Sequence, residues 1–300
     1  MNALNPIRLG LLLTLLFLLA APAFAGSPPQ MPEHWSEGYV MANGIRVHYY
    51  RTGGDKPVLI LAHGYSDDGL CWVPFALELE DNFDIIMTDA RGHGLSDPGS
   101  GTDPADVQVE DLAGLINELC LEKPIIMGHS MGSSSAAWFA ARYPDVPKAV
   151  ILEDPRLVSK PTSQTTPEEI SSQQERRFAQ TLARNNQSYD ELLEQCLTSS
   201  PNWERLECEY WAVSKMRYHP STALIRWNDR PSISDLFARI TAPTLILKAD
   251  AEGELRQGNE AVAAILENGE LVHVEGAGHC VHRDQKDISL ATVREFLPED

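Results

Sequence analysis

Basic residues are scarce in this sequence. Its 300 residues include 24 Lys and Arg against 43 Asp and Glu, which gives a formal net charge of −19. A surface this acidic repels phosphate backbones and anionic lipid headgroups, so nucleic acid is not expected as a partner. Internal periods typical of collagen, coiled coils or solenoids are also missing. The hydrophobic fraction of 43% is nevertheless too high for a disordered chain, and a globular fold with a sizeable core is expected.

Cysteine is sparse and odd in number. The five residues are Cys71, Cys120, Cys196, Cys208 and Cys280. At least one thiol must therefore stay free or pair between chains. None of them forms a CxxC motif or a Cys/His cluster with zinc spacing, so neither a metal nor another cofactor is expected. Cys196 and Cys208 are close enough in sequence to form a disulfide within one segment, while the pairing of the other three stays open.

Long hydrophobic runs are missing as well. The longest, Leu9–Ala20, has about 12 residues, whereas a membrane-spanning helix needs roughly 20. Arg8 precedes this run, and Ala23-Phe24-Ala25 places small residues at positions −3 and −1 of a cleavage site. Residues 1–25 are therefore interpreted as a secretory signal peptide, with an uncleaved N-terminal anchor as the alternative. The mature protein is expected to be exported, to the periplasm or the medium, without stable membrane insertion.

Short apolar runs alternate with amphipathic stretches along the rest of the chain. The runs predict buried strands at Val58–Leu61, Ile85–Met87, Ile125–Met127, Ala149–Leu152, Thr244–Leu247 and Leu271–Val274. The amphipathic stretches predict helices near Val107–Leu119, Ser133–Arg142, Gly258–Glu267 and Ser289–Phe296. Asn43-Gly44 predicts a tight hairpin turn between two earlier strands, Gly38–Val40 and Ile45–Tyr50. This order predicts an α/β fold with a doubly wound, mostly parallel sheet.

One long segment interrupts the alternation. Between Asp154 and Ile240 the sequence shows no strand signal, and Thr166 with Glu169 and Ser188 with Glu191 form two helix capping boxes. We interpret residues 156–240 as an inserted helical lid over the strand ends, and the alternative is a packing subdomain without a gating role. The remaining divisions are a linker at 26–36 and a core built from 37–155 and 241–300. Aromatic residues in the insertion include Trp203, Tyr210, Trp211 and Trp227.

A G-x-S-x-G motif, Gly128–Gly132, lies between a predicted strand and a predicted helix. Such a turn forces its serine into a strained conformation with the hydroxyl projecting above the sheet, and small flanking residues let strand and helix approach. Ser130 is therefore the predicted nucleophile. The backbone N–H groups of Tyr65, in a His-Gly-Tyr turn, and of Met131 are the expected oxyanion donors. His63 in that turn is expected to have a structural role.

The predicted base is His279, which follows the last strand in a Gly-Ala-Gly-His segment. His282 is the nearby rival, but it lies where a helix should begin. The carboxylate that orients the imidazole is ambiguous in sequence, because Asp154 ends one strand while Asp250 and Glu252 follow the next.

These motifs together resemble the α/β-hydrolase superfamily. The resemblance covers roughly Gly38 to Leu297 and includes the Asp89–Asp97 turn, Asp-Ala-Arg-Gly-His-Gly-Leu-Ser-Asp, which has a structural role in that family. In the family the acid usually follows the strand after the lid, where this sequence has Glu252. Some members, including zearalenone-type lactonases, place it after the preceding strand, and Asp154 matches that position. Asp154 is the leading candidate, with Glu252 and Asp250 as alternatives.

The resemblance implies a mechanism rather than a substrate. A serine at position 130 argues against haloalkane dehalogenase and epoxide hydrolase chemistry, which use a carboxylate nucleophile. It implies hydrolysis of a small-molecule carboxylic ester or lactone through an acyl-enzyme, without a cofactor. A C–C bond hydrolase or a perhydrolase with the same triad is the alternative, followed by a non-catalytic binding protein on the same fold. The oligomeric state stays open.

Overall fold

The computed structural model of the chain describes residues 27–158, 166–226 and 229–297. The predicted signal peptide and Trp227 lie outside these residues. In the described part, no helix combines the length and the apolar character needed to cross a membrane.

The described strands form one sheet of eight, in the order β1-β2-β4-β3-β5-β6-β7-β8. The six strands from β4 to β8 in this order pair in parallel, whereas β2 pairs antiparallel with β4 on one side and with β1 on the other. This confirms the doubly wound sheet, and the hairpin turn has the positive φ angles expected at Asn43 (46°) and Gly44 (81°). The strands are β1 (Ser36–Ala42), β2 (Ile45–Arg51), β3 (Val58–Ala62), β4 (Asp84–Thr88), β5 (Ile125–His129), β6 (Ala149–Glu153), β7 (Thr244–Ala249) and β8 (Gly269–Val274).

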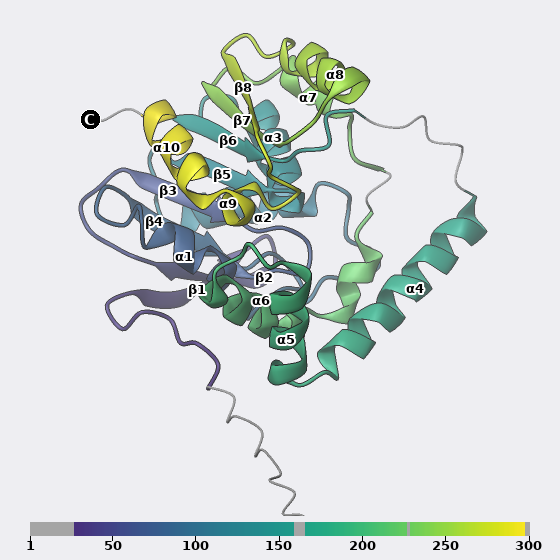
Figure 1. Ribbon diagram of the computed structural model, residues 1–300. Helices are drawn as coiled ribbons and strands as arrows, with labels where there is room; N and C mark the ends of the chain where they lie inside the picture. The colour runs from purple at the N-terminus through teal and green to yellow at the C-terminus, as the bar shows by residue number, and fades with distance from the viewer. Residues whose placement is uncertain (1–26, 159–165, 227–228, 298–300) are drawn as a thin grey trace, which may run out of the picture.

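Helices cover both faces of the sheet (Figure 1). Successive strand residues point to opposite faces, so the apolar runs supply two cores. Alternate strand residues pack against α1, α9 and α10 on one face and against α2, α3, α7 and α8 on the other. The helices that flank the sheet are α1 (Val73–Ala76), α2 (Val107–Glu118), α3 (Met131–Arg142), α7 (Ile233–Phe237), α8 (Gly253–Ala263), α9 (Val281–Asp284) and α10 (Lys286–Phe296).

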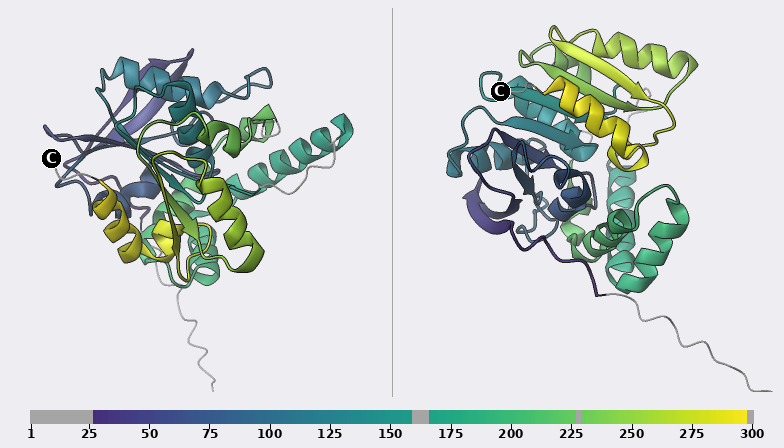
Figure 2. Two further views of the ribbon diagram at one scale, coloured as in Figure 1. Left: turned by 90° about the horizontal axis from the view of Figure 1, so that it is seen from above. Right: turned by 60° about the vertical axis from the view of Figure 1, so that its left-hand side comes forward.

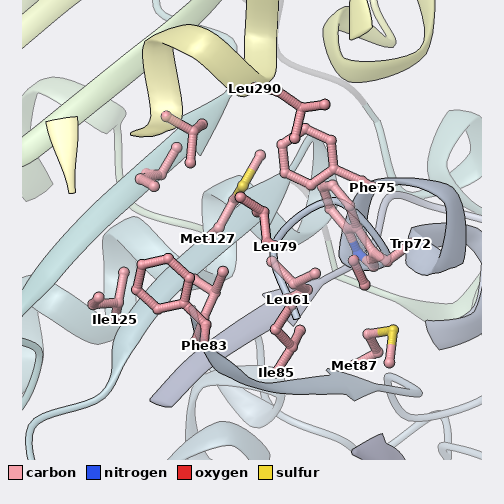
Figure 3. Packing of buried hydrophobic residues seen from close by; sticks show 14 of the residues in the cluster. Leu61, Trp72, Phe75, Leu79, Phe83, Ile85, Met87, Ile125, Met127 and Leu290 are labelled. Carbon is pink, nitrogen blue, oxygen red and sulfur yellow. The ribbon is translucent and has the colours of Figure 1, made fainter. Parts of the chain in front are cut away.

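The first of these cores contains most of the large aromatic side chains of the sheet region. Figure 3 shows Phe75 of α1, Leu79 from the turn after it and Leu290 of α10 near Met127 of β5 and the neighbouring strands. Phe75 and Met127 are completely buried. This core therefore fixes the sheet beneath the carboxyl end of β5, where Ser130 follows.

The inserted segment between β6 and β7 is helical, as expected. It contains α4 (Pro167–Asn185), α5 (Tyr189–Ser199), α6 (Arg205–Arg217) and the 3₁₀ turn η2 (Pro220–Leu224), and both expected capping boxes are present. In two different views α4 extends away from the body of the molecule (Figures 1 and 2). Cys196 of α5 and Cys208 of α6 form a disulfide.

One expected helix start differs from the structure. The helix expected near Gly258 begins five residues earlier, at Gly253, with Glu252 at its N-cap. At the end of the insertion, Leu236 and Phe237 of α7 and Ile240 belong to the second core beside α3. This last part of residues 156–240 therefore packs against the sheet region, and a lid role for the insertion stays a prediction.

Candidate active site

The turn from β5 to α3 holds Ser130 in a conformation that few residues adopt. Its φ of 51° and ψ of −103° place it outside the usual regions for a residue with a side chain. Glycine is required on both sides. A Cβ on Gly128 would lie 2.3 Å from the carbonyl carbon of Gly132, and one on Gly132 would lie 2.1 Å from the carbonyl oxygen of Ala62. The strand and the helix thus approach as the motif predicts, and the α3 N-terminus points at Ser130.

Ser130, His279 and Asp154 form one hydrogen-bonded chain. The hydroxyl of Ser130 lies 2.8 Å from Nε2 of His279, whose Nδ1 lies 2.5 Å from Oδ2 of Asp154. Ser130 follows β5, Asp154 follows β6 and His279 follows β8, so parallel strands bring their carboxyl ends together. With Nδ1–H donating to Asp154, Nε2 of His279 is free to accept the serine proton. The His279 side chain is 58% exposed, which leaves the site open to a substrate.

Charges around this chain tune its two titratable members. The hydrogen bond that His279 donates to Asp154 raises the pKa of His279, and this effect outweighs the opposing effect of burial. Burial raises the pKa of Asp154, but hydrogen bonds from His279 and Lys248 outweigh it, so the net pKa of this carboxyl is lowered. The side chain of Lys248 and the backbone N–H of Ala249 both donate to Oδ1 of Asp154. Asp154 is therefore ionised and oriented.

The other acids considered from the sequence have different contacts. Asp250 accepts a hydrogen bond from the backbone N–H of Gly276 at 3.0 Å, and Glu252 is the N-cap residue of α8. His282, the rival base, places Nδ1 2.7 Å from Oε1 of the buried Glu153. The structure brings Asp154, and neither Asp250 nor Glu252, to His279 among the hydrogen bonds of the described residues.

The loop after β3 approaches the nucleophile closely. A Cβ on Gly64 would lie 2.6 Å from Nδ1 of His129 and 3.6 Å from Cβ of Ser130, so only glycine fits there. Gly64, the residue before Tyr65, thus lies close to Ser130, and the assignment of the Tyr65 and Met131 N–H groups as oxyanion donors stays a prediction. His63 lies within this loop, where Nδ1 contacts the carbonyl of Gly64 at 2.7 Å and Nε2 accepts from the N–H of Ala90 at 3.0 Å. These contacts are structural.

Two supporting residues were missed by sequence reasoning. His129, the variable residue of the motif before the serine, donates from Nε2 to the carbonyl of His279 at 2.9 Å and so holds the base loop. Burial lowers the pKa of His129 to about 4, which keeps its ring neutral in that role. Lys248 contacts Asp154 from the neighbouring strand. Its position at the end of a strand next to the acid is a usable signal, whereas His129 has none in sequence.

In residues 27–158, 166–226 and 229–297, no group of three His, Cys, Asp or Glu residues is arranged to hold a metal ion. The residues described above are the groups that the site offers for chemistry. They comprise a serine hydroxyl, an imidazole and a carboxylate in one hydrogen-bonded chain, with a glycine loop beside them.

Several of the curated proteins and solved structures to which this chain is similar are hydrolases. The chain is 29% identical over 266 residues to N-formylmaleamate deformylase of Pseudomonas putida, covering 87% of this chain and 96% of the relative. It is 27% identical over 297 residues to epoxide hydrolase 1 of Caenorhabditis elegans, covering 90% and 72%. A thermophilic esterase structure from Thermogutta terrifontis matches with a TM-score of 0.67 at 25% identity, covering 87% of this chain and 97% of that one.

The model of the alpha/beta hydrolase family matches residues 59–289, which include the nucleophile turn, the insertion and the base loop. Its range covers most of the described sheet. With these relatives and this fold, the chain belongs to the alpha/beta hydrolase family.

Proposed function

We propose that this protein is an exported serine hydrolase that cleaves a carboxylic ester or lactone through an acyl-enzyme on Ser130. The hydrogen-bonded chain from Ser130 through His279 to Asp154 is the observation that carries the proposal. Family membership supports hydrolysis as the reaction class. The predicted signal peptide supports export, and the exposed imidazole supports access by a small molecule from solvent.

The proposed mechanism assigns one task to each group. Oγ of Ser130 attacks the carbonyl carbon while Nε2 of His279 takes its proton. Asp154 stabilises the imidazolium that forms, and the backbone N–H groups of Tyr65 and Met131 receive the oxyanion. His279 then protonates the leaving alcohol, and a water activated by the same imidazole hydrolyses the acyl-enzyme.

A serine at position 130 argues against epoxide opening, despite the similarity to an epoxide hydrolase, because that chemistry needs a carboxylate nucleophile. The second candidate is hydrolysis of an N-acyl bond, which the similarity to a deformylase supports. Both reactions would use the same acyl-enzyme, since only the leaving group differs.

The test is hydrolysis of p-nitrophenyl esters from acetate to laurate, with an N-formyl amide and a lactone in parallel. Wild type, Ser130→Ala and Ser133→Ala are compared as mature chains. Ser133 lies three residues further along α3 and is fully buried, so its variant is the matched control. We expect Ser130→Ala to lose about 10⁴-fold or more in kcat with an unchanged melting temperature, and Ser133→Ala to stay near wild type.

The substrate panel separates the candidates. Turnover of esters or lactones above the amide supports the proposal, and the reverse order supports N-acyl hydrolysis. Equal activity of Ser130→Ala and wild type would rule out this nucleophile. A folded wild type that is inert on every probe would rule out simple ester hydrolysis.

A further inference from the structure

Buried charges lie directly beneath the loop that carries Tyr65. Asp67 of this loop accepts hydrogen bonds from Nζ of Lys215 in α6 and, at 3.0 Å, from Nη2 of Arg283 in α9. The side chains of Asp67, Lys215 and Arg283 are 7%, 2% and 2% exposed. Burial raises the pKa of Asp67, but the charges of Lys215 and Arg283 outweigh it and keep the carboxyl ionised. One carboxylate thus joins three separate segments of the chain.

Lys215 also holds the backbone of the same loop. Its Nζ donates to the carbonyl of Ser66 at 2.8 Å, in the peptide that joins Ser66 to Asp67. The N–H of Ser66 lies 3.3 Å from Nε2 of His93, and the N–H of Asp67 donates to the carbonyl of Gly64 at 3.1 Å. The peptide groups on the C-terminal side of Tyr65 are therefore fixed by both donors and acceptors.

The network continues to the loop of the base. Arg283 follows His279 by four residues, and its Nε pairs with Glu207 of α6 at 3.3 Å. Trp203, just before α6, donates from Nε1 to Asp284 at 2.7 Å. The other oxygen of Asp284 accepts from the backbone N–H of Gly278 at 2.8 Å, next to His279. The region of α6 thus contacts both halves of the proposed site.

Such a network is better suited to fixing the positions of the groups around it than to stabilising the fold. Buried ion pairs bring little net stabilisation, because desolvation of the charges offsets their attraction, whereas they specify one arrangement of the groups around them. Here the groups around Asp67 are the loop of Tyr65, helix α6 and helix α9. An exposed pair on the same helix, Arg205 with Glu209, lies away from this loop.

We propose that Lys215, acting through Asp67 and the carbonyl of Ser66, is a positioning residue that aims the N–H of Tyr65 at the oxyanion. Helix α6 is on this view a fixed part of the catalytic machinery, and not a moving cover. The inference rests on the proposed function, because it assumes an oxyanion at that N–H. It predicts an effect on the transition state and little effect on substrate binding.

The test compares Lys215→Met with Arg205→Met, a cation-to-methionine change on the same helix at an exposed position. Activity is measured on the best ester and is normalised to folded protein. We expect Lys215→Met to lower kcat by about 10- to 100-fold with KM within about threefold, since loss of an oxyanion donor costs about 10²–10³ in kcat. The acid limb of its pH–rate profile should not move, because His279 and Asp154 are untouched. Arg205→Met should match wild type.

A second variant guards against a folding defect. Lys215→Met leaves Asp67 with one cation fewer, whereas Lys215→Met with Asp67→Asn removes both buried charges of the pair. If the role is positioning, the double variant stays at low kcat even where its melting temperature recovers. Recovery of kcat together with stability, or an unchanged kcat in either variant, overturns the inference. The proposed function fails on a different result, full activity of Ser130→Ala.

Discussion

Two carboxylate–histidine pairs lie next to each other where β6 ends, and they are built from neighbouring residues. Glu153 contacts His282, and Asp154 contacts His279, each through Nδ1 of the ring. The first pair is completely buried, with Glu153 at 0% and the His282 side chain at 1% exposure, and the His282 ring stacks on Trp72 at 4.3 Å. The second pair is at the surface, with His279 58% exposed.

The difference lies at the far nitrogen of each ring. Nε2 of His279 lies 2.8 Å from the hydroxyl of Ser130. Nε2 of His282 is buried, and within the described residues it has no hydrogen-bond partner. A carboxylate beside an imidazole is thus not enough for catalysis. The imidazole must also face a nucleophile and be reachable by substrate, and on these grounds we assign chemistry to one pair and structure to the other.

The division of roles between the two pairs is tested most directly by neutralising each acid in turn. We expect Asp154→Asn to lower kcat by about 10⁴-fold, because His279 loses the partner that fixes its tautomer and stabilises its cation. Glu153→Gln, a change of the same size one residue earlier, should stay within about tenfold of wild type per folded molecule. Steady-state kinetics on purified, folded variants measure both. Equal losses in the two variants would contradict the division of roles.

The free energy of unfolding should respond in the opposite sense, with the larger loss in Glu153→Gln and the smaller one in Asp154→Asn. Burial raises the pKa of Glu153, but His282 and His129 lower it further, to about 2, against an ordinary value of 4.5. Its folded pKa is depressed, so its contribution to stability is present above pH 4.5 and is lost as the pH falls toward 2. Glu153→Gln should be less stable at pH 7 by about 3–5 kcal/mol, because His282 would stay buried without its carboxylate partner, and it should be less sensitive to acid over this range.

Urea unfolding between pH 7 and pH 2 checks this expectation, with Asp154→Asn as the control. Asp154 is also near charged groups, but it lies at the rim of the site, and its variant should lose less than Glu153→Gln at pH 7. If both variants unfold at the same urea concentration, the buried pair contributes no more to stability than the exposed pair.

The pH dependence of catalysis should follow the exposed pair. The base must be neutral to act, so kcat/KM falls as the pH drops through the pKa of His279. Because the hydrogen bond that His279 donates to Asp154 raises this pKa, the acid limb should lie above the ordinary value of 6.5. Asp154→Asn should move the limb to lower pH, while Glu153→Gln should move it less. A pH–rate profile of each enzyme measures the limb, and a limb below 6.5 in wild type would contradict the expectation.

The smallest effect is expected from a substitution of Lys248. This residue is a cation that contacts Asp154 of the exposed pair. Its charge lowers the pKa of both Asp154 and His279. Lys248→Met should therefore raise the pKa of His279 and shift the acid limb upward by a few tenths of a unit, with kcat changed by less than about fivefold. The same pH–rate measurement detects it. A downward shift would show that Lys248 acts in some other way.

Much of the fold could be predicted because its signals are local. Each of the six apolar runs is a strand, the Asn43-Gly44 turn has the expected dihedrals, and Gly128 and Gly132 permit the close approach that the motif requires. The start of α8 could not be predicted, because Gly253–Gln257 carries no apolar periodicity and its helix depends on the strand before it.

The acid and the ion-pair network depend on distant contacts, and this is why sequence left them open. Asp154, Asp250 and Glu252 all lie at strand ends, and only the approach of the base loop distinguishes them. Similarly, nothing near Lys215 in sequence indicates Asp67, which lies 148 residues away. The apolar residues of α7 are typical of any amphipathic helix, so sequence did not show that they face α3.

Helix α4 is only slightly buried. Of its 19 residues only Thr181 is buried, the helix supplies its own capping box, and Phe178 and Leu182 are 46% and 42% exposed. Substitutions on most of this helix remove almost no packing, so they should cost the protein little stability. In evolutionary terms α4 can accumulate substitutions at little cost to the fold.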